Sequence, residues 1–503
     1  MHLNRSLILL LVMMLVAVVA LSGCAAVEQG NTQAAATNPN SGGGASGKLP
    51  VTTASEDARK EFLQGRDLQD KLLIQDSIAH FDKALSLDPN FAIAELNRAN
   101  VSPTGKEFFD HLKKAVSLSD KASNGERLLI LATEAGANAN ATKQKELLDQ
   151  LVAAYPNDER AHFVLGGYYF GQQDYPKAIE HYKKATELSP TYSGAFNILG
   201  YAYRQNADYA NAEQAFKKYI ELIPKDPNPY DSYAELLLKM GRFDEAIVQY
   251  RKALEIDPNF INAHQGIAAA QLYSGKPDDA AAELQKITDK ARSDAERRTA
   301  LFGLTVVDID SGKMDKALAE VDKQYALGEK TNDIPGMTGD LQLKGNILLE
   351  TGKFDEAKIQ FDRALKMTEA SNLSAEIKDN ARLFNHFNLA RVALGKKDLA
   401  TAKTEAEAYR KGTDALKNPF QIKQAHSLAG MIALEEKDFD KAIAELQQAN
   451  SQNPYDLYRL CQAYQGKGDM GKAKEFCAKA ASFNSLPQLN LAFIRVKAAK
   501  THG

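Results

Sequence analysis

Apolar and small residues recur along the chain at the spacing of helix faces, and in the middle of the sequence the pattern repeats every 34 residues. In the unit spanning residues 159–190, one stripe precedes a short polar stretch at residues 171–174 and a second stripe follows it. The two stripes consist of His162, Leu165, Gly166 and Tyr169, and of Ala178, Tyr182 and Ala185. Because residues with this spacing share one face of an α-helix, each stripe predicts a helix. Each unit is therefore predicted to be a hairpin of two helices.

A small residue marks the first helix of each unit, and these markers can be followed through most of the chain. The markers are Gly65, Ala99, Ala132, Gly166, Gly200, Ala234, Ala268, Thr305, Gly345, Ala390, Gly430 and Cys461, which gives about twelve units. After Ala268 the spacing widens to 37, 40, 45 and 40 residues before it falls to 31. The sequence thus predicts two arrays, with a boundary near residues 290–296.

The repeating hairpin, with glycine or alanine in its first helix and proline after its second, resembles the tetratricopeptide repeat family. Gly166 is followed by Pro190, and the next unit repeats this with Gly200 and Pro224. The resemblance implies an all-α fold, a right-handed α-solenoid whose stacked hairpins present a curved binding surface. We also expect a C-terminal capping helix at residues 486–500, because the last hairpin of a solenoid otherwise exposes an apolar face.

The N-terminus has the features of a targeting segment. Arg5 precedes an unbroken apolar run at residues 7–21, and Leu-Ser-Gly-Cys follows at residues 21–24. These four residues resemble a bacterial lipobox, which implies that Cys24 is lipidated and becomes the mature N-terminus at a membrane surface outside the cytoplasm. The alternatives are an uncleaved anchor, for which the run is short, and an ordinary signal peptide with a chance cysteine. In lipoproteins of Gram-negative bacteria, an aspartate directly after the lipidated cysteine favours retention in the inner membrane. Ala25 occupies this position here, so the resemblance implies the outer membrane, facing the periplasm.

The sequence divides into five parts on these grounds. The stretch after Cys24 is rich in Gly, Ser, Asn and Thr without apolar periodicity, which is typical of a flexible tether. The parts are a signal peptide at 1–23, the lipidated cysteine and tether at 24–54, an N-terminal array at 55–292, a C-terminal array with longer repeats at 293–485, and a capping helix and tail at 486–503.

Charge and histidine placement argue against several functions. The formal net charge is −3, with 62 basic and 65 acidic residues, so no basic excess favours nucleic acid as a partner. Four of the nine histidines occupy the same repeat position, where we expect packed, hydrogen-bonded side chains rather than metal ligands: His162, His264, His386 and His426. No catalytic or phosphate-binding motif occurs, so we expect no enzyme activity, no metal and no cofactor.

Two cysteines besides Cys24 lie sixteen residues apart in the last hairpin, at Cys461 and Cys477. Cys461 occupies the marker position of its unit. Cys477 occupies the position of the second helix that holds a large residue, Tyr182, in the unit of Gly166. These two positions are expected to pack against each other within a hairpin. In an oxidising compartment a disulfide is the preferred interpretation. The alternative is a pair of buried thiols.

The concave groove is where the resemblance places the binding surface. In the strict part of the array the candidate lining residues are Phe163, Phe170, Asn197, Tyr201, Arg204, Asp231, Glu235 and Gln265. They suit a peptide with apolar and polar side chains, but they would equally suit contacts between repeats.

The leading hypothesis is a lipid-tethered scaffold that binds envelope proteins or peptides and assembles or localises a periplasmic or outer-membrane complex. The alternative is an enzyme, or a regulatory subunit of one, that acts on peptidoglycan or exopolysaccharide. A third alternative is self-association through the capping helix or the first repeat.

Overall fold

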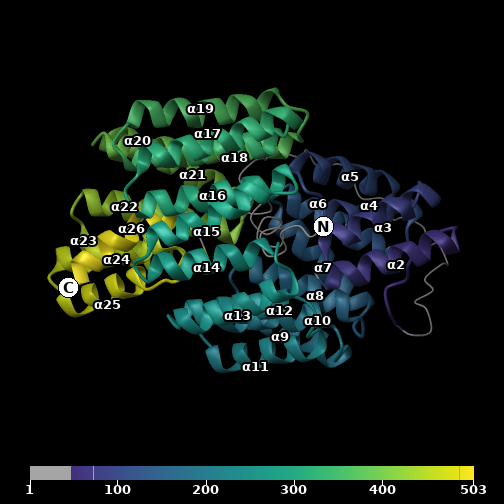
Figure 1. Cartoon of the computed structure of the whole chain (residues 1–503). Helices are drawn as coiled ribbons and strands as arrows, with labels where there is room; N and C mark the ends of the chain where they lie inside the picture. The colour runs from purple at the N-terminus through teal and green to yellow at the C-terminus, as the bar shows by residue number, and fades with distance from the viewer. Residues whose placement is uncertain (1–46, 72, 487, 503) are drawn as a thin grey trace, which may run out of the picture.

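Twelve antiparallel helical hairpins and one last helix make up the part of the chain that the structure describes (Figure 1). This computed structural model describes residues 47–71, 73–486 and 488–502, and no strand occurs within these ranges. The first six hairpins are α2 (Glu56–Asp70) with α3 (Ile74–Leu87), α4 (Ala92–Asn100) with α5 (Gly105–Leu118), α6 (Asn124–Ala137) with α7 (Ala141–Ala154), α8 (Glu159–Gly171) with α9 (Tyr175–Leu188), α10 (Ser193–Gln205) with α11 (Tyr209–Leu222), and α12 (Asn228–Lys239) with α13 (Phe243–Ile256). A short 3-10 helix, η1 (Ser119–Lys121), follows α5.

The next six hairpins continue the same order. They are α14 (Ile261–Tyr273) with α15 (Pro277–Lys290), α16 (Asp294–Asp310) with α17 (Met314–Thr331), α18 (Ile334–Glu350) with α19 (Phe354–Ala370), α20 (Ala375–Gly395) with α21 (Leu399–Leu416), α22 (Pro419–Glu435) with α23 (Phe439–Leu446), and α24 (Pro454–Lys467) with α25 (Met470–Ala481). The chain ends with α26 (Leu489–His502). The prediction of an all-α solenoid of about twelve hairpins is confirmed.

Each hairpin closes around the small marker of its first helix. A Cβ atom added to Gly166 would lie 2.8 Å from the ring of Tyr182, sixteen residues later on α9, and one added to Gly345 would lie 2.3 Å from the ring of Phe361 on α19. Both rings are fully buried. The large side chain therefore fills the space that the missing side chain leaves, which gives the hairpin its dense core.

The turns within hairpins use local chemistry that recurs from repeat to repeat. Several first helices end at a glycine with φ between 75° and 87°, the left-handed region that glycine adopts without a steric penalty: Gly241, Gly275, Gly312, Gly352 and Gly468. Several second helices begin after an aspartate whose carboxylate accepts a backbone N–H of the first turn: Asp174, Asp208, Asp398, Asp438 and Asp469.

Longer helices account for the wider spacing of the later markers. The helices from α8 to α15 have 12 to 14 residues, whereas those from α16 to α22 have 17 to 21. The added residues extend the hairpins and leave the core positions in register.

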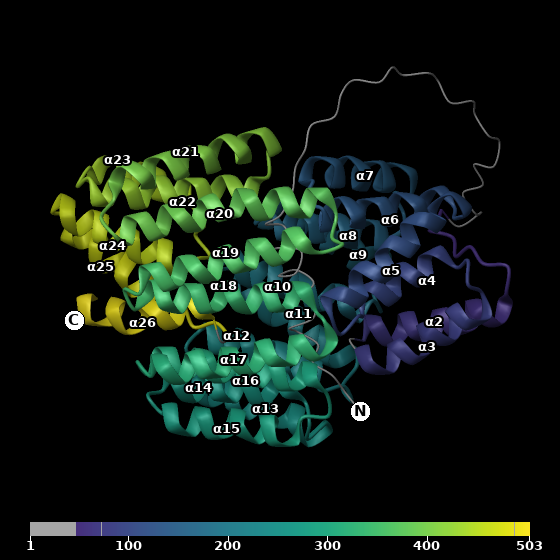
Figure 2. The ribbon, with the colours of Figure 1, turned by 90° about the horizontal axis from the view of Figure 1, so that it is seen from above.

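The solenoid curls until its later hairpins touch its earlier ones (Figure 2). Ser374, just before α20, donates a hydrogen bond of 3.0 Å to the side chain of Asn138. Lys423 on α22 donates to the Gln173 side chain at 3.0 Å, in the turn between α8 and α9. These contacts join segments about half the chain apart. Hydrogen bonds between early and late hairpins therefore add to the contacts between neighbouring hairpins.

The last helix does more than cap the last hairpin. α26 packs on α24 and α25 and also reaches α16, where Leu491 and Ile494 share a buried cluster with Val306. The guanidinium of Arg495 donates to Asp310 at the end of α16, with an Nε to Oδ1 distance of 2.8 Å. The C-terminal helix therefore joins hairpins that are distant along the array.

Candidate functional site

The groove expected in the N-terminal array is filled by the protein itself. Asn197, Asp231, Glu235 and Gln265 are between 0% and 3% exposed, so none of them is available to a partner. Their assignment to an open groove is corrected. The reason is geometric, because the consecutive first helices α10, α12 and α14 contact one another.

These side chains bind neighbouring repeats to one another. The Tyr201 hydroxyl donates to Glu235 at 2.9 Å, and the Arg204 guanidinium donates to the other oxygen of the same carboxylate at 3.0 Å. Burial raises the pKa of Glu235 in spite of the nearby Arg204. Two repeats further on, the Gln265 amide donates to the carbonyl of Thr299 at 3.1 Å. Of the two interpretations of this set, contact between repeats is the one that these hydrogen bonds fit.

The two phenylalanines of the set lie partly exposed in aromatic clusters. The ring of Phe163 lies 5.7 Å from that of Tyr182 and 5.3 Å from that of Tyr192. The ring of Phe170 lies 5.6 Å from that of Tyr175. These contacts are typical of packing between helices.

The four histidines at the shared repeat position make hydrogen bonds between the two helices of their hairpins. Three of them contact a glutamate nineteen residues later, in the pairs His264 with Glu283, His386 with Glu405, and His426 with Glu445. His162 instead lies 3.1 Å from His181 through the Nδ1 atoms, and its Nε2 contacts the Pro156 carbonyl at 3.0 Å. Each ring therefore has a local partner, which fits the packed, hydrogen-bonded role.

A disulfide joins Cys461 on α24 to Cys477 on α25, with 5.1 Å between the Cα atoms. Both residues are fully buried, in the positions that Gly345 and Phe361 occupy in their hairpin. The covalent bond thus replaces the usual contact between a small and a large side chain. Cys24, the expected lipidation site, lies outside the described residues.

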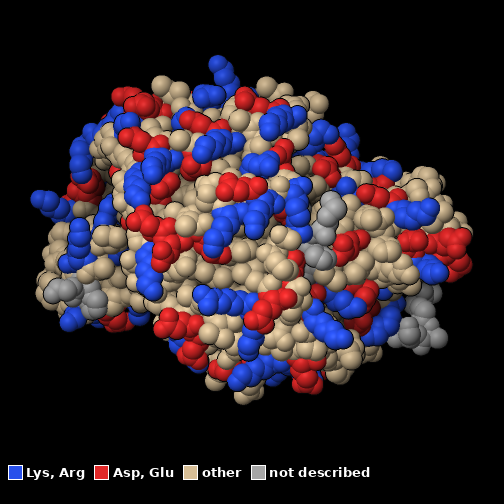
Figure 3. Space-filling view, in the orientation of Figure 1, with Lys and Arg blue, Asp and Glu red and all other residues tan. Residues whose placement is uncertain are grey.

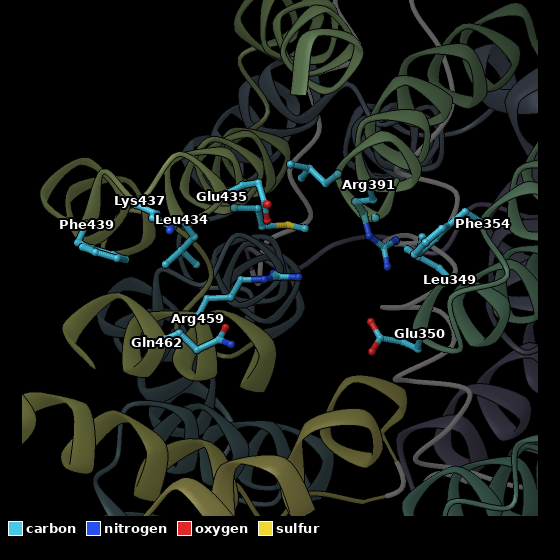
Figure 4. Close-up of a pocket in the computed structure, with 13 residues that line it drawn as sticks. Leu349, Glu350, Phe354, Arg391, Leu434, Glu435, Lys437, Phe439, Arg459 and Gln462 are labelled. Carbon is cyan, nitrogen blue, oxygen red and sulfur yellow. The ribbon is translucent and has the colours of Figure 1, made fainter. Parts of the chain in front are cut away.

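An open cavity of 530 Å³ lies in the C-terminal array, at the C-terminal ends of α18, α20 and α22 and the middle of α24 (Figure 4). The first residues of α19 and α23 and the turn between α22 and α23 complete its lining. The lining residues are Leu349, Glu350, Phe354, Arg391, Leu394, Gly395, Met431, Leu434, Glu435, Lys437, Phe439, Arg459 and Gln462. This volume is within the range of ligand pockets in proteins.

Two arginines point toward the middle of this cavity from different helices (Figure 4). Arg391 on α20 donates to the Asn346 side chain at 2.8 Å, and its guanidinium lies 5.5 Å from the ring centre of Phe387. Arg459 on α24 donates to Asp456 at 2.8 Å. Arg459 therefore has a carboxylate partner, whereas Arg391 is held by a neutral amide and an aromatic ring.

The acidic groups at the cavity already have other partners. Lys497 of α26 donates to Glu350 at 3.3 Å, and Lys397 donates to both oxygens of Glu435 at 2.9 Å. On the face in Figure 3, basic and acidic side chains are interspersed, so that face carries no extended surface of one sign. The acidic side chains of the cavity lining are thus compensated by lysines close to them.

The candidate residues from the sequence all lie in the strict repeats, so none of them lines this cavity. One of them, Tyr201, directly follows its marker, Gly200. The same position after later markers holds Arg391 after Ala390, Met431 after Gly430, and Gln462 after Cys461, and these three residues line the cavity.

Models of the tetratricopeptide repeat match the chain in several places. One matches residues 237–301, a second matches 166–207, and a third matches 193–226, 341–371 and 424–456. The matches fall in both arrays. The chain contains tetratricopeptide repeats. The recognition made from the period and the markers is confirmed.

Solved structures with similarity to this tetratricopeptide repeat chain share little sequence with it. A tetratricopeptide repeat protein from Parabacteroides merdae is 16% identical, covers 52% of this chain and 98% of its own, and has a TM-score of 0.35. The MamA protein is 24% identical, covers 34% and 96%, and has a TM-score of 0.29. PilF of Pseudomonas aeruginosa is 16% identical, covers 44% and 92%, and has a TM-score of 0.31. No curated protein matches the sequence.

Proposed function

We propose that this protein is a membrane-tethered scaffold that binds other proteins or peptides of the cell envelope and assembles or localises their complex. The observation that carries the proposal is the continuous array of hairpins from α2 to α25, because tetratricopeptide repeats serve as scaffolds for protein interactions. The cavity of the C-terminal array supplies an open, partly apolar surface on this scaffold.

A rigid array suits this role for a physical reason. The partner of a pre-formed surface loses less conformational freedom than one that must order a flexible protein, so more of the contact energy appears as affinity. The contacts of α26 with α16 and the disulfide between α24 and α25 stiffen the array near the cavity.

The membrane part of the proposal comes from the sequence. The lipobox-like residues 21–24 and the tether that follows them support a lipid anchor on Cys24, outside the cytoplasm and facing the periplasm. Among the described residues, no helix combines the length and hydropathy needed to cross a bilayer. A flexible tether confines the array near the membrane and so raises its local concentration there.

Cys24→Ser tests the anchor. We expect the unmodified protein to sediment with membranes and the variant to be released, with unchanged circular dichroism. If the variant stays with the membrane after a high-salt wash, the lipid is not the anchor.

Co-purification tests the scaffold. A defined set of envelope proteins should purify with the anchored protein after crosslinking in intact cells, and a matched control, an unrelated lipoprotein expressed at the same level, should lack that set. Turnover of purified glycan strands by the isolated protein would contradict the proposal and support an enzyme.

A further inference from the structure

Arg391 is the feature of the cavity that the fold itself leaves unexplained. Among the residues that the structure describes, no carboxylate lies within ion-pair distance of its guanidinium, and the hydrogen-bond partner is the neutral side chain of Asn346. Burial, together with the nearby Arg459, lowers the pKa of Arg391 to about 10. Burial therefore destabilises the charged form of Arg391, and a negative group bound in the cavity would offset this effect.

The neighbouring acidic groups supply that negative charge only in part: Glu350 raises the pKa of Arg391 without offsetting the effect of burial, and it forms no ion pair with the guanidinium. Glu350 accepts from Lys497 and Glu435 accepts from Lys397, while Asp456 accepts from Arg459 on the other side of the cavity. Each of these carboxylates is compensated locally.

The walls of the cavity include apolar side chains that favour an apolar ligand group beside the charged one. Leu349 and Phe354 lie on one side and Leu434 and Phe439 on the other (Figure 4), and Met431 also belongs to the lining. Apolar side chains that border an open cavity gain free energy when an apolar ligand covers them. A methionine adapts its shape to different ligands, since its side chain is unbranched and flexible.

We propose that this cavity binds an extended acidic and apolar segment of a protein partner, with one ligand carboxylate between Arg391 and Arg459 and a neighbouring apolar side chain against the cavity wall. The inference rests on the scaffold function proposed above and names the chemistry of the partner. A guanidinium suits this role because it donates two parallel hydrogen bonds to one carboxylate.

The charge balance favours a carboxylate over a phosphate group. Among the described lining residues, Arg391 and the exposed Lys437 form no ion pair. Lys437 stays hydrated, so one negative charge at Arg391 completes the buried part of the site, whereas a phosphate monoester carries a charge of about −1.5 to −2. Glu350 and Glu435 at the lining would repel the excess. Inorganic phosphate would also leave the apolar walls uncovered.

The test measures binding of a short fluorescein-labelled peptide in which Glu and Leu alternate, by fluorescence anisotropy with the purified full chain. The matched peptide has Gln in place of Glu. We expect the Glu peptide to bind at least about tenfold more tightly than the Gln peptide, and Arg391→Gln to remove that preference. Arg391→Lys should restore part of it, because the charge returns without the fork of donors. Arg363→Gln, at an exposed arginine on α19, is the control and should leave binding unchanged.

Three outcomes would overturn the inference. They are equal binding of the two peptides, an equal loss of binding with Arg363→Gln, and complete competition by inorganic phosphate at a concentration where chloride of equal ionic strength has no effect. Thermal melts of each variant separate a lost contact from a lost fold. If the envelope complex forms but the peptide preference is absent, the inference fails and the scaffold function stands. If the preference is present and no envelope protein is found, the scaffold function fails instead.

Discussion

Reducing the disulfide between Cys461 and Cys477 should loosen the C-terminal end of the array far more than the rest. The bond closes a loop with a sequence separation of 16, for which loop entropy gives about 3 kcal/mol. If the free energy of local opening of this hairpin falls by about 3 kcal/mol, the population of the open state rises about a hundredfold. Because α26 packs on this hairpin and on α16, the effect should reach both.

Hydrogen exchange measured by mass spectrometry, with and without reductant, tests this. Peptides from α24, α25 and α26 should exchange much faster after reduction, and a double Cys461→Ala, Cys477→Ala variant should reproduce the change. The hairpin of α12 and α13 is the internal control, since Ala234 and Tyr250 occupy the equivalent positions. Unchanged exchange in α24 and α25, with both thiols shown to be free by alkylation, would refute the reasoning. So would an equal increase in the control hairpin.

Two further predictions concern the core and the histidine pairs. Gly345→Ala places a Cβ atom 2.3 Å from the ring of Phe361, so the hairpin must shift and stability should fall by about 1 to 3 kcal/mol; a thermal melt without a lower midpoint would contradict the packing. The hydrogen bond from His264 lowers the pKa of Glu283 from about 4.5 in the unfolded chain to about 2 in the folded one. A carboxylate whose pKa falls on folding stabilises the folded state at pH values above 4.5, and this stabilisation is lost as the pH falls toward 2. The stability lost in Glu283→Gln, measured by urea unfolding, should therefore shrink from pH 6 to about pH 2, and a loss that is constant over this range would exclude the ion pair as its cause.

The sequence was sufficient for the hairpins because their determinants are local. The small marker and the large side chain sixteen residues later, as in Gly166 and Tyr182, are visible in one unit and recur in the next. The longer repeats of the later units could also be predicted, because the markers Gly345 and Ala390 keep their place in the first helix while the spacing between markers increases.

The sequence was insufficient for the site because curvature and long-range pairing are set by the whole array. Glu235 has the expected repeat position, but the close approach of α10, α12 and α14 buries it. Arg391 follows its marker in the same way as Tyr201, yet the charges around it depend on Glu350, which is paired with Lys497 of α26, 147 residues later. No local pattern contains that information.

Site-specific photo-crosslinking in intact cells tests the central claim most directly. A photo-reactive amino acid at Gln462, in the cavity lining, is compared with one at Ile359, which is 54% exposed on α19. The account predicts one discrete adduct with an envelope protein from position 462, its loss in Arg391→Gln at an unchanged protein level, and no such adduct from position 359. An adduct that forms equally from both positions, or that persists in Arg391→Gln, would contradict binding of a protein partner through this cavity.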